Sequence, residues 1–320
     1  MIIGVDIGGT TVKIGMINNG GEILKKWEIP TNTLNAGESI IGDVWHSINN
    51  ELTASKIDKS TILGIGVGAP GFIDASDGFI FEAVNIGWKE FDLTNQLIKM
   101  SGLPVFLEND ANIAVLGENW RGAGKQVRNL IAITLGTGVG GGIIVNGSIL
   151  NGENGMAGEI GHITIDPNGA PCNCGRLGCL ETIASATGIV RQAMDKIAEN
   201  PNSKIADFVQ RNGAVTTKDI FNLANTGDSL SVGIIKNTAD ALGMVIANMG
   251  VIVNPASVLI GGGVSKAGDQ LIGEITKAFE KYALPRVVEA CEIKIAQLGN
   301  DAGIIGAAFL VKQKLQGLTF

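Results

Sequence analysis

Four residues in the middle of the chain have the types and the spacing of a metal site. His162 is followed by Cys172, Cys174 and Cys179 in an H-x9-C-x-C-x4-C arrangement. One imidazole and three thiolates supply a complete tetrahedral ligand set for zinc and leave no open position for a substrate. The loop is rich in glycine and has few apolar residues of its own, so the sequence predicts structural Zn²⁺ rather than free thiols. Such cysteines are typical of a reducing compartment, and we expect a cytoplasmic protein.

Three glycine-rich turns, each after a short apolar run, have the composition of phosphate-binding or nucleotide-binding turns. They are Asp6-Ile7-Gly8-Gly9-Thr10-Thr11, Gly136-Thr137-Gly138 and Gly261-Gly262-Gly263. Glycine lets the backbone N–H groups approach a phosphate, and threonine hydroxyls add further donors. Any one of them could be an ordinary turn, but three in one chain favour a nucleotide site. Asp6 ends an apolar strand, where a carboxylate is costly unless it meets a cation.

Acidic residues near the strand ends are candidates for acid–base work. Glu108-Asn109-Asp110 follows an apolar run and precedes a helical pattern, a place where α/β folds bind ligands. The alternative is that Asn109 and Asp110 only cap the helix. Glu159 and Glu181 bracket the cysteine loop, where they could be solvated or could accept hydroxyl groups of a substrate.

Apolar periodicity gives the elements that must position these residues. The expected strands are 2–6, 11–17, 22–30, 62–69, 104–107, 130–135, 141–145, 258–260 and 292–296. The expected helices are 38–52, 91–100, 109–120, 270–282 and 302–314, with a mostly helical pattern over 187–249. Alternating strands and helices indicate the α/β class. Residues 5–14 and 134–144 both read as strand, glycine turn and strand, which suggests two related domains with a cleft between them.

Composition excludes some classes of protein. The 320 residues carry a net charge of −7 without a Lys/Arg cluster, which argues against nucleic-acid binding. The most apolar stretch, residues 241–253, is interrupted by Asn248 and is shorter than the ~20 residues that span a bilayer. We therefore expect a buried helix there and no membrane partner. The chain enters a strand-like run at Ile2, and we expect no signal peptide.

Taken together, these motifs resemble the ROK family of sugar kinases and repressors, within the actin-like ATPase superfamily, and most of all its bacterial glucokinase branch. The resemblance runs nearly end to end. It rests on DIGGT (6–10), GAPG (68–71), END (108–110), LGTGVGGG (135–142), GEIGH (158–162), CNCGRLGCLE (172–181) and IGGGVS (260–265). It implies two actin-like, ribonuclease H-like α/β domains with an interdomain cleft. We expect domain boundaries at 1–120 plus the C-terminal helix 302–320, and at 121–301, and a homodimer or tetramer.

The resemblance also implies an activity, the phosphorylation of glucose to glucose 6-phosphate by ATP with Mg²⁺. The implied ATP contacts are Asp6, Gly8, Gly9, Thr10, Thr11, Lys13, Gly136, Thr137, Gly138, Gly261, Gly262 and Gly263. The implied sugar contacts are Gly71, Asn85, Asn109, Asp110, Glu159, His162 and Glu181. Asp110 matches the catalytic base of the family, and His162 with the three cysteines matches its zinc site.

Three alternatives stay open at this point. The first keeps the chemistry but changes the acceptor to another hexose, such as N-acetylmannosamine or fructose. The second is a sugar-sensing ROK repressor, which would carry a helix-turn-helix segment ahead of the first phosphate strand, whereas that strand begins here at residue 2. The third is a sugar-binding protein without catalysis, which the presence of Asp110 and of the phosphate turns disfavours.

Overall fold

The computed structural model describes residues 1–320, which form two compact units. The first unit comprises residues 1–128, 142–158 and 297–320, and the second comprises residues 129–141 and 159–296. The expected boundaries placed residues 121–128, 142–158 and 297–301 in the second domain, whereas all three segments fall in the first unit. Residues 142–158 lie in the first unit because their side chains and backbone bond there: Asn151 Nδ2 donates to Glu108 Oε2 at 3.1 Å, and the Gly147 N–H donates to the Arg128 carbonyl at 2.8 Å.

The first unit contains a mixed five-stranded sheet in the order β3-β2-β1-β4-β8. Its strands are β1 (Ile2–Ile7), β2 (Thr11–Ile17), β3 (Ile23–Pro30), β4 (Ile65–Ala69) and β8 (Val105–Asn109). Its helices are α1 (Ile40–Ala54), α2 (Leu93–Ser101), α3 (Asp110–Arg121) and α11 (Ala302–Gln316), with 3-10 turns η1 (Leu34–Gly37), η2 (Lys59–Thr61) and η5 (Gly299–Asp301). These elements confirm the expected ones to within a few residues at their ends.

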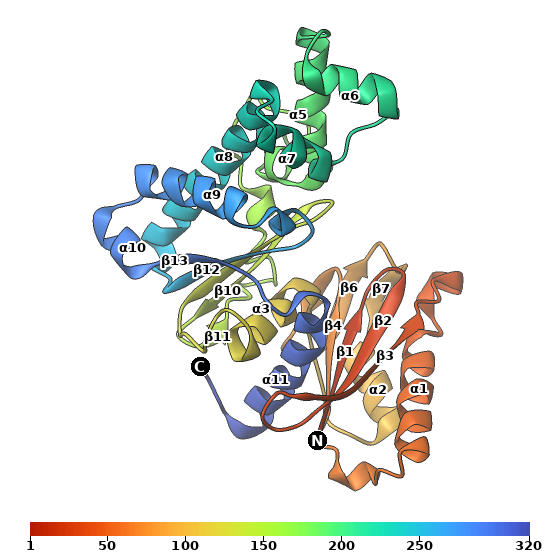
Figure 1. Ribbon diagram of the computed structural model, residues 1–320. Helices are drawn as coiled ribbons and strands as arrows, with labels where there is room; N and C mark the ends of the chain where they lie inside the picture. Colours follow the sequence, from red (N-terminus) through yellow and green to blue (C-terminus); the bar gives the residue numbers. More distant parts are fainter. The chain divides into compact units, whose positions relative to one another are not determined.

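Strand alternation decides which helices cover which face of this sheet. Val5 and Val67 belong to a core that includes Val44 of α1. Their neighbours Gly4 and Gly66 pair in register and face α11, where a Cβ would lie within 2.0 Å of a helix carbonyl oxygen. Figure 1 shows α1 and α2 on one side of the sheet and α3 and α11 on the other. Glycine on one face of β1 and β4 therefore lets α11 approach the sheet closely.

A small antiparallel sheet in the first unit was not expected from the sequence. It is formed by β5 (Phe72–Asp74), β6 (Phe79–Ala83) and β7 (Trp88–Phe91). The strands are short, and only Ile73, Ile80, Ala83 and Trp88 among them are buried. So weak a period-2 pattern, with exposed Phe72 and Phe81, gives little signal.

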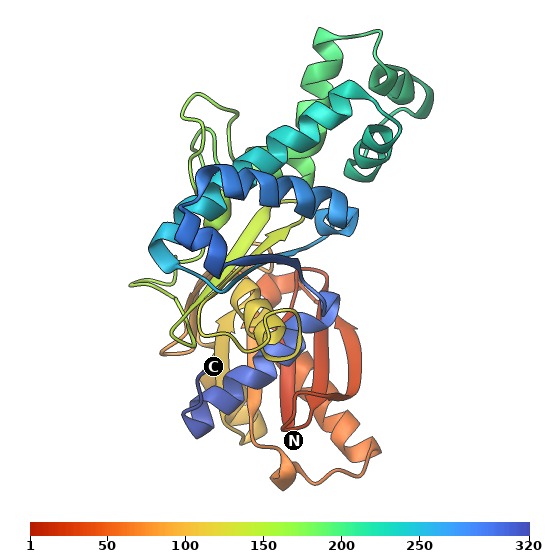
Figure 2. The ribbon, with the colours of Figure 1, turned by 60° about the vertical axis from the view of Figure 1, so that its left-hand side comes forward.

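The second five-stranded sheet has the order β11-β10-β9-β12-β13. Its strands are β9 (Leu130–Leu135), β10 (Val139–Val145), β11 (Ser148–Ile149), β12 (Ser257–Gly261) and β13 (Glu292–Ile295). The helices of the second unit are α4 (Glu181–Ala184), α5 (Ala186–Glu199), α6 (Lys204–Asn212), α7 (Thr217–Asn225), α8 (Ser229–Val253), α9 (Asp269–Tyr282) and α10 (Pro285–Ala290), with 3-10 turns η3 (Ile160–His162) and η4 (Val264–Ala267). Figure 2 shows the long α8 beside α9 within this unit.

The two sheets have the same strand order when each is numbered from its own first strand. Both read third, second, first, fourth and fifth strand, with a glycine turn between the first and second. Each of these two sheets is combined with flanking helices, and the α/β class expected from the sequence is confirmed. The shared order supports the suggestion that the two strand–turn–strand segments belong to related domains.

The most apolar helix is longer than the sequence indicated. The apolar stretch that begins at residue 241 is the second half of α8, which has 25 residues. By length and composition alone α8 could span a membrane, but 61% of its most apolar window is buried within the protein. It is capped at the start by Asp228, whose carboxylate accepts from the Ser231 N–H at 2.8 Å. Its burial is that of a core helix, as expected.

Candidate functional site

The first glycine turn joins β1 to β2 in the first unit. The Gly8 N–H donates to the Thr11 carbonyl at 3.0 Å, which closes the hairpin, while Gly9 and Thr10 are exposed. The Thr31 hydroxyl donates to the Gly8 carbonyl at 2.7 Å and ties the turn to the residue that follows β3. The tip of the turn is thus held in place and accessible, which a phosphate-binding turn requires.

Asp6 lies on the face of the first sheet that α11 covers. A Cβ at Gly303 would lie 2.5 Å from Asp6 Oδ2, so the helix begins directly against the carboxylate. Lys13 Nζ lies 3.8 Å from the same oxygen. Burial raises the pKa of Asp6 above its ordinary value, and the charge of Lys13 opposes this rise only in part. A partly buried carboxylate with a single cation near it is suited to bind a further positive charge, such as a metal ion.

The end of β8 and the start of α3 hold the next two candidates. Asn109 is the N-cap of α3, since its Oδ1 accepts from the Ala111 N–H at 2.9 Å. Asp110 is the first helical residue, half-buried, and its Oδ1 accepts from the same N–H at 2.8 Å. The capping role considered from the sequence is therefore real for Asn109. Asp110 stands at the positive end of the helix dipole, which favours its carboxylate form.

Gly71 and Asn85 lie near these residues in the first unit. Asn109 Nδ2 donates to the Gly71 carbonyl at 3.4 Å. Gly71 has φ +105°, and a Cβ there would lie 2.2 Å from the Glu82 carbonyl oxygen, so only glycine fits. Asn85 is exposed in the turn between β6 and β7, and a Cβ at Gly9 would contact its Cβ at 3.8 Å. The first unit thus brings Gly71 beside Asn109 and Asn85 beside the first glycine turn.

The second glycine turn joins β9 to β10 in the second unit. The Gly136 N–H donates to the Gly138 carbonyl at 2.9 Å, and Thr137 is exposed at the tip. The Val139 N–H donates to Glu181 Oε2 at 3.0 Å, and a Cβ at Gly138 would lie 2.3 Å from that oxygen. Glycine at position 138 therefore lets the Glu181 carboxylate bind the backbone at the end of the turn.

The third glycine turn follows β12 and packs against the second. Gly262 has φ +84°, and a Cβ there would lie 2.4 Å from the carbonyl oxygen of Leu135, the last residue of β9. Gly261 is buried at the end of β12, whereas Gly262 and Gly263 are exposed. The second unit therefore brings two of the three predicted turns together.

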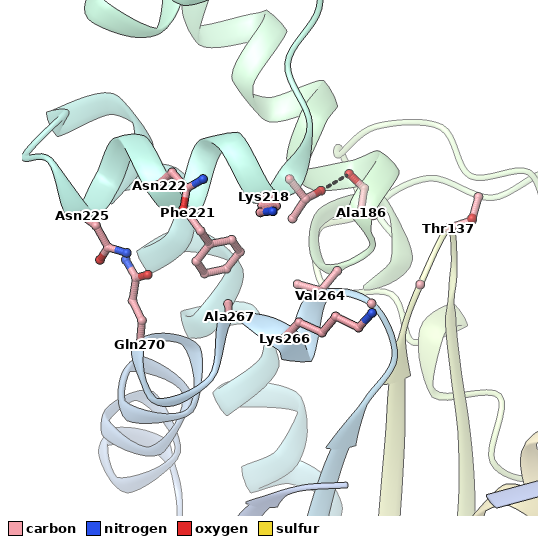
Figure 3. Close-up of a pocket in the computed structure, with 13 residues that line it drawn as sticks. Thr137, Ala186, Lys218, Phe221, Asn222, Asn225, Val264, Lys266, Ala267 and Gln270 are labelled. Atoms are coloured by element: carbon pink, nitrogen blue, oxygen red, sulfur yellow. Dashed lines mark hydrogen bonds between the residues drawn. The ribbon is translucent and has the colours of Figure 1, made fainter. Parts of the chain in front are cut away.

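A pocket of about 850 Å³ lies beside these two turns, entirely within the second unit. Gly136, Thr137 and Gly263 contribute to its wall from the turns. Figure 3 shows Thr137 at one end, Asn225 and Gln270 at the other, and the Phe221 ring between them. Its volume suits a small-molecule ligand that is partly apolar and has a few polar groups.

Sequence reasoning missed most of the residues that line this pocket. α7 contributes Phe221, Asn222 and Asn225, and Lys266 and Gln270 come from η4 and α9. The sequence pattern marks one face of α7 as apolar but does not say which part of the fold that face meets. Packing of α7 beside η4 brings these residues to the glycine turns, and no local motif encodes that contact.

His162 and the three cysteines of the predicted metal site come together in the second unit. Their ligand atoms all lie within 4.8 Å of one another. His162 Nδ1 lies 3.7 Å from Cys172 Sγ, and Cys174 Sγ lies 3.6 Å from Cys179 Sγ. Zinc–sulfur bonds of about 2.3 Å in a tetrahedron give sulfur separations of close to 3.8 Å. The number, type and spacing of these donors fit a structural zinc ion.

The pKa values of the three cysteines differ in the absence of a metal. Hydrogen bonding from the Arg176 guanidinium lowers the pKa of Cys174 to about 6. Burial raises the pKa of Cys179 to about 12, and burial also raises the pKa of Cys172. Two of the three cysteines are therefore thiols unless a cation stabilises their thiolates, which is what a zinc ion supplies.

The two glutamates that bracket the loop have different surroundings. Glu159 is exposed, and its Oε2 lies 4.0 Å from His162 Nε2, the ring nitrogen that does not face the cysteines. A carboxylate at this nitrogen is the usual way in which a metal-binding histidine is oriented. Glu181 is half-buried and bonds the second glycine turn through Oε2, while its Oε1 lies 3.7 Å from Cys172 Sγ. Glu181 therefore joins the cysteine loop to the turn.

Comparison with known proteins gives consistent matches over the whole chain. The ROK family model matches residues 2–314. The glucokinase of Halalkalibacterium halodurans is 52% identical over 313 residues, which cover 98% of this chain and 95% of that protein. The ROK hexokinase of Thermus thermophilus superposes with a TM-score of 0.83 at 30% identity, covering 99% of both chains. A ROK family glucokinase of Streptomyces griseus, solved in complex with glucose and AMPPNP, superposes with a TM-score of 0.76 at 33% identity, covering 98% of this chain and 99% of that one.

These matches agree with the ordered motifs and with the two sheets of equal strand order. They extend over nearly the full length of each relative, so the similarity is not confined to the glycine turns or to the cysteine loop. The chain therefore belongs to the ROK family.

Proposed function

We propose that this protein is an ATP-dependent glucokinase that transfers the γ-phosphoryl group of ATP to the 6-hydroxyl of glucose. The observation that supports this most is the likeness, over 98% of the chain, to a glucokinase solved with glucose and an ATP analogue. Identity of 52% to a second glucokinase supports the same substrate. The pocket beside the second and third glycine turns supports a nucleotide, because its walls combine residues of two glycine turns with an aromatic ring.

In this proposal the adenosine occupies the pocket beside Gly263 and Phe221. The first glycine turn would offer backbone N–H groups to phosphate, and so would the second, while Asp6 would help to hold Mg²⁺, which supplies charge stabilisation when bound. Lys13, which is 3.8 Å from Asp6, adds positive charge near the first turn. Phosphoryl transfer needs positioning and charge stabilisation more than covalent chemistry from the protein.

Asp110 is the proposed catalytic base. It orients the 6-hydroxyl and accepts its proton as the oxygen attacks phosphorus. A carboxylate at a helix start is a weak base, which suffices because the proton leaves late in a loose transition state. The remaining proposed sugar contacts are Gly71, Asn85, Asn109, Glu159, His162 and Glu181.

Zinc has a structural role in this proposal. The ion would be held by His162, Cys172, Cys174 and Cys179, and it would order the loop that carries Glu181. Since the His162 imidazole and the Glu181 carboxylate both contact Cys172, order in the loop fixes both side chains. We further propose a cytoplasmic enzyme that assembles as a homodimer or tetramer and has no nucleic-acid or membrane partner.

The test is sugar-dependent ADP formation by the purified protein with Mg²⁺. Glucose, mannose, fructose, N-acetylglucosamine and N-acetylmannosamine are compared with a reaction that lacks sugar. We expect strong turnover with glucose and little with the others. Preference for another hexose would change the substrate and keep the chemistry. The absence of any sugar-dependent turnover in zinc-replete protein would indicate a sensor or a binding protein instead.

A further inference from the structure

A buried carboxylate lies next to the proposed catalytic base and has no part in the mechanism so far. Glu108, in β8, is 4% exposed. Its Oε1 accepts from the Asn109 N–H at 2.9 Å and from Asn112 Nδ2 at 3.0 Å, and its Oε2 accepts from Asn151 Nδ2 at 3.1 Å. Both oxygens are therefore bonded, each by donors that belong to residues of the first unit.

The donors around Glu108 are backbone and amide N–H groups. A carboxylate oxygen accepts hydrogen bonds, and here each oxygen of Glu108 accepts at least one. The nearby start of α3 adds the positive end of a helix dipole. Burying a polar group is costly unless it is hydrogen-bonded, and the bonds to both oxygens offset that cost for Glu108.

The bonds of Glu108 define the position of the residues on either side of Asp110. Its Oε1 holds the N–H of Asn109, which directly precedes Asp110, and the side chain of Asn112, which follows it by two residues. Asn109 in turn caps α3 through the Ala111 N–H. The backbone that carries Asp110 is thus fixed before and after by one carboxylate.

The second oxygen of Glu108 extends this cluster to a distant part of the chain. Asn151 lies in the segment 142–158, and besides its bond to Glu108 its Oδ1 accepts from Asn112 Nδ2 at 3.2 Å. Glu108, Asn112 and Asn151 therefore form a closed ring of hydrogen bonds, in which Asn112 is 4% exposed. A closed ring of this kind resists movement of any one member.

We propose that Glu108 is a positioning residue that sets the orientation of Asp110 for proton removal. This inference rests on the proposed function and goes beyond it, because Glu108 acts through Asp110 and the α3 start rather than on the substrate. In Glu108→Gln, the amide nitrogen faces one of the three N–H donors, so the ring loses a bond and Asp110 loses its fixed position.

The experiment is a double-mutant cycle between Glu108→Gln and Asp110→Asn, measured as kcat with saturating ATP and sugar. Misplacing a catalytic group by about 1 Å can cost up to ~100-fold in rate, so we expect Glu108→Gln to lower kcat by about 10- to 100-fold. In the Asp110→Asn background the same change should lower kcat by less than about 2-fold, because residues that act as a unit are not additive. Equal effects in both backgrounds would overturn the proposal.

Glu118→Gln is the matched control. Glu118 lies in α3, the helix that begins at Asp110. Like Glu108 it is 4% exposed, and its carboxylate accepts from the N–H groups of Ala123, Gln297 and Leu298 at 3.1, 3.0 and 2.6 Å. The variant makes the same chemical change at a carboxylate that bonds none of the residues 108–112. Whatever effect it has on kcat should be the same in both backgrounds. A non-additive effect for Glu118 as well would show that the cycle reports general loosening of α3.

Amide hydrogen exchange gives a readout that needs no turnover. Exchange at residues 109–112 should be faster in Glu108→Gln than in the wild type, and Glu118→Gln should not change it. Unchanged exchange in Glu108→Gln would overturn the proposal even if Asp110→Asn were too slow to assay. If the wild type lacked sugar-dependent turnover, the proposed function would fail, while exchange would still test whether Glu108 fixes this segment.

Discussion

The glycine turn of the first unit and that of the second connect equivalent strands, yet the carboxylate beside each comes from a different place. In the first, Asp6 stands two residues before Gly8, within the strand itself. The equivalent residue of the second is Thr134, two residues before Gly136, and the carboxylate is Glu181 from the far end of the cysteine loop. The carboxylate beside the first turn therefore belongs to the strand that leads into the turn, whereas the carboxylate beside the second turn comes from a separate segment of the chain.

This difference has energetic consequences. In the first unit, partial burial of the Asp6 carboxylate lowers the free energy of unfolding when the group is charged, and the raised pKa of Asp6 reflects this. In the second unit, the bond between Glu181 and the turn is expected to depend on the order of the cysteine loop that precedes Glu181. Stability of the first turn should thus depend on pH, and that of the second on zinc.

The largest expected effect concerns the residues at the end of the fifth strand of each sheet. β8 ends at Asn109 and is followed at once by Asp110, whereas β13 is followed by Ala296 and Gln297 without an acid. We expect Asp110→Asn to lower kcat by about 10²- to 10⁴-fold with sugar binding kept, because only the general base is removed. Steady-state kinetics and calorimetric sugar binding measure the two parts. Near-normal turnover would remove Asp110 from the mechanism.

The next effect tests whether zinc supports the second unit. Cys174→Ser should lose the metal and raise the KM for sugar by about 10- to 100-fold, since the loop that holds Glu181 and His162 loosens. Zinc content per chain and KM are measured on the same preparation. Cys291→Ser is the control, because Cys291 lies outside the cluster and its loss should leave one zinc per chain. Zinc-free protein with an unchanged KM would refute this coupling.

A smaller effect tests the contact between the second turn and Glu181. Gly138→Ala would place a methyl group 2.3 Å from Glu181 Oε2, so we expect a loss of about 1–3 kcal/mol in the free energy of unfolding. Gly136→Ala is the matched change in the same turn, where a Cβ meets nothing within 4 Å, and should cost less than about 1 kcal/mol. Denaturant unfolding compares the two. Equal losses would mean that the Glu181 contact does not constrain the turn.

The smallest expected effect concerns the Asp6 carboxylate beside the first turn. Because the folded pKa of Asp6 is raised, folding is favoured by protonation below the ordinary pKa of 3.8, and that advantage is lost as pH rises through the folded pKa. Asp6→Asn has no charge to bury, so its stability relative to that of the wild type should rise from pH 4 to pH 7. The variant should be less active than the wild type, because Asp6 is proposed to help hold Mg²⁺. Unfolding at both pH values checks the sign. A relative stability that falls from pH 4 to pH 7 would show that the Lys13 pair outweighs burial.

Much of this protein could be predicted from local pattern alone. The strands around the first turn, the apolar face of α1 and the N-cap at Asn109 follow from period-2 and period-3.6 spacing and from capping chemistry, which involve residues close together in sequence. The cysteine loop was predictable for the same reason, since all four ligands fall within 18 residues. The three short strands β5, β6 and β7 were missed because their exposed phenylalanines hide the alternation.

The sequence by itself determined the α/β class, the cluster of one histidine and three cysteines that could hold zinc, and the candidate base, because each depends on residue type and short spacing. Only the tertiary structure decided that segment 142–158 belongs to the first unit, that Glu108 is bonded by Asn151, and that α7 and α9 complete the pocket beside the glycine turns. Those contacts join residues about 40 to 130 positions apart. They depend on which faces pack together, and no local spacing records that choice.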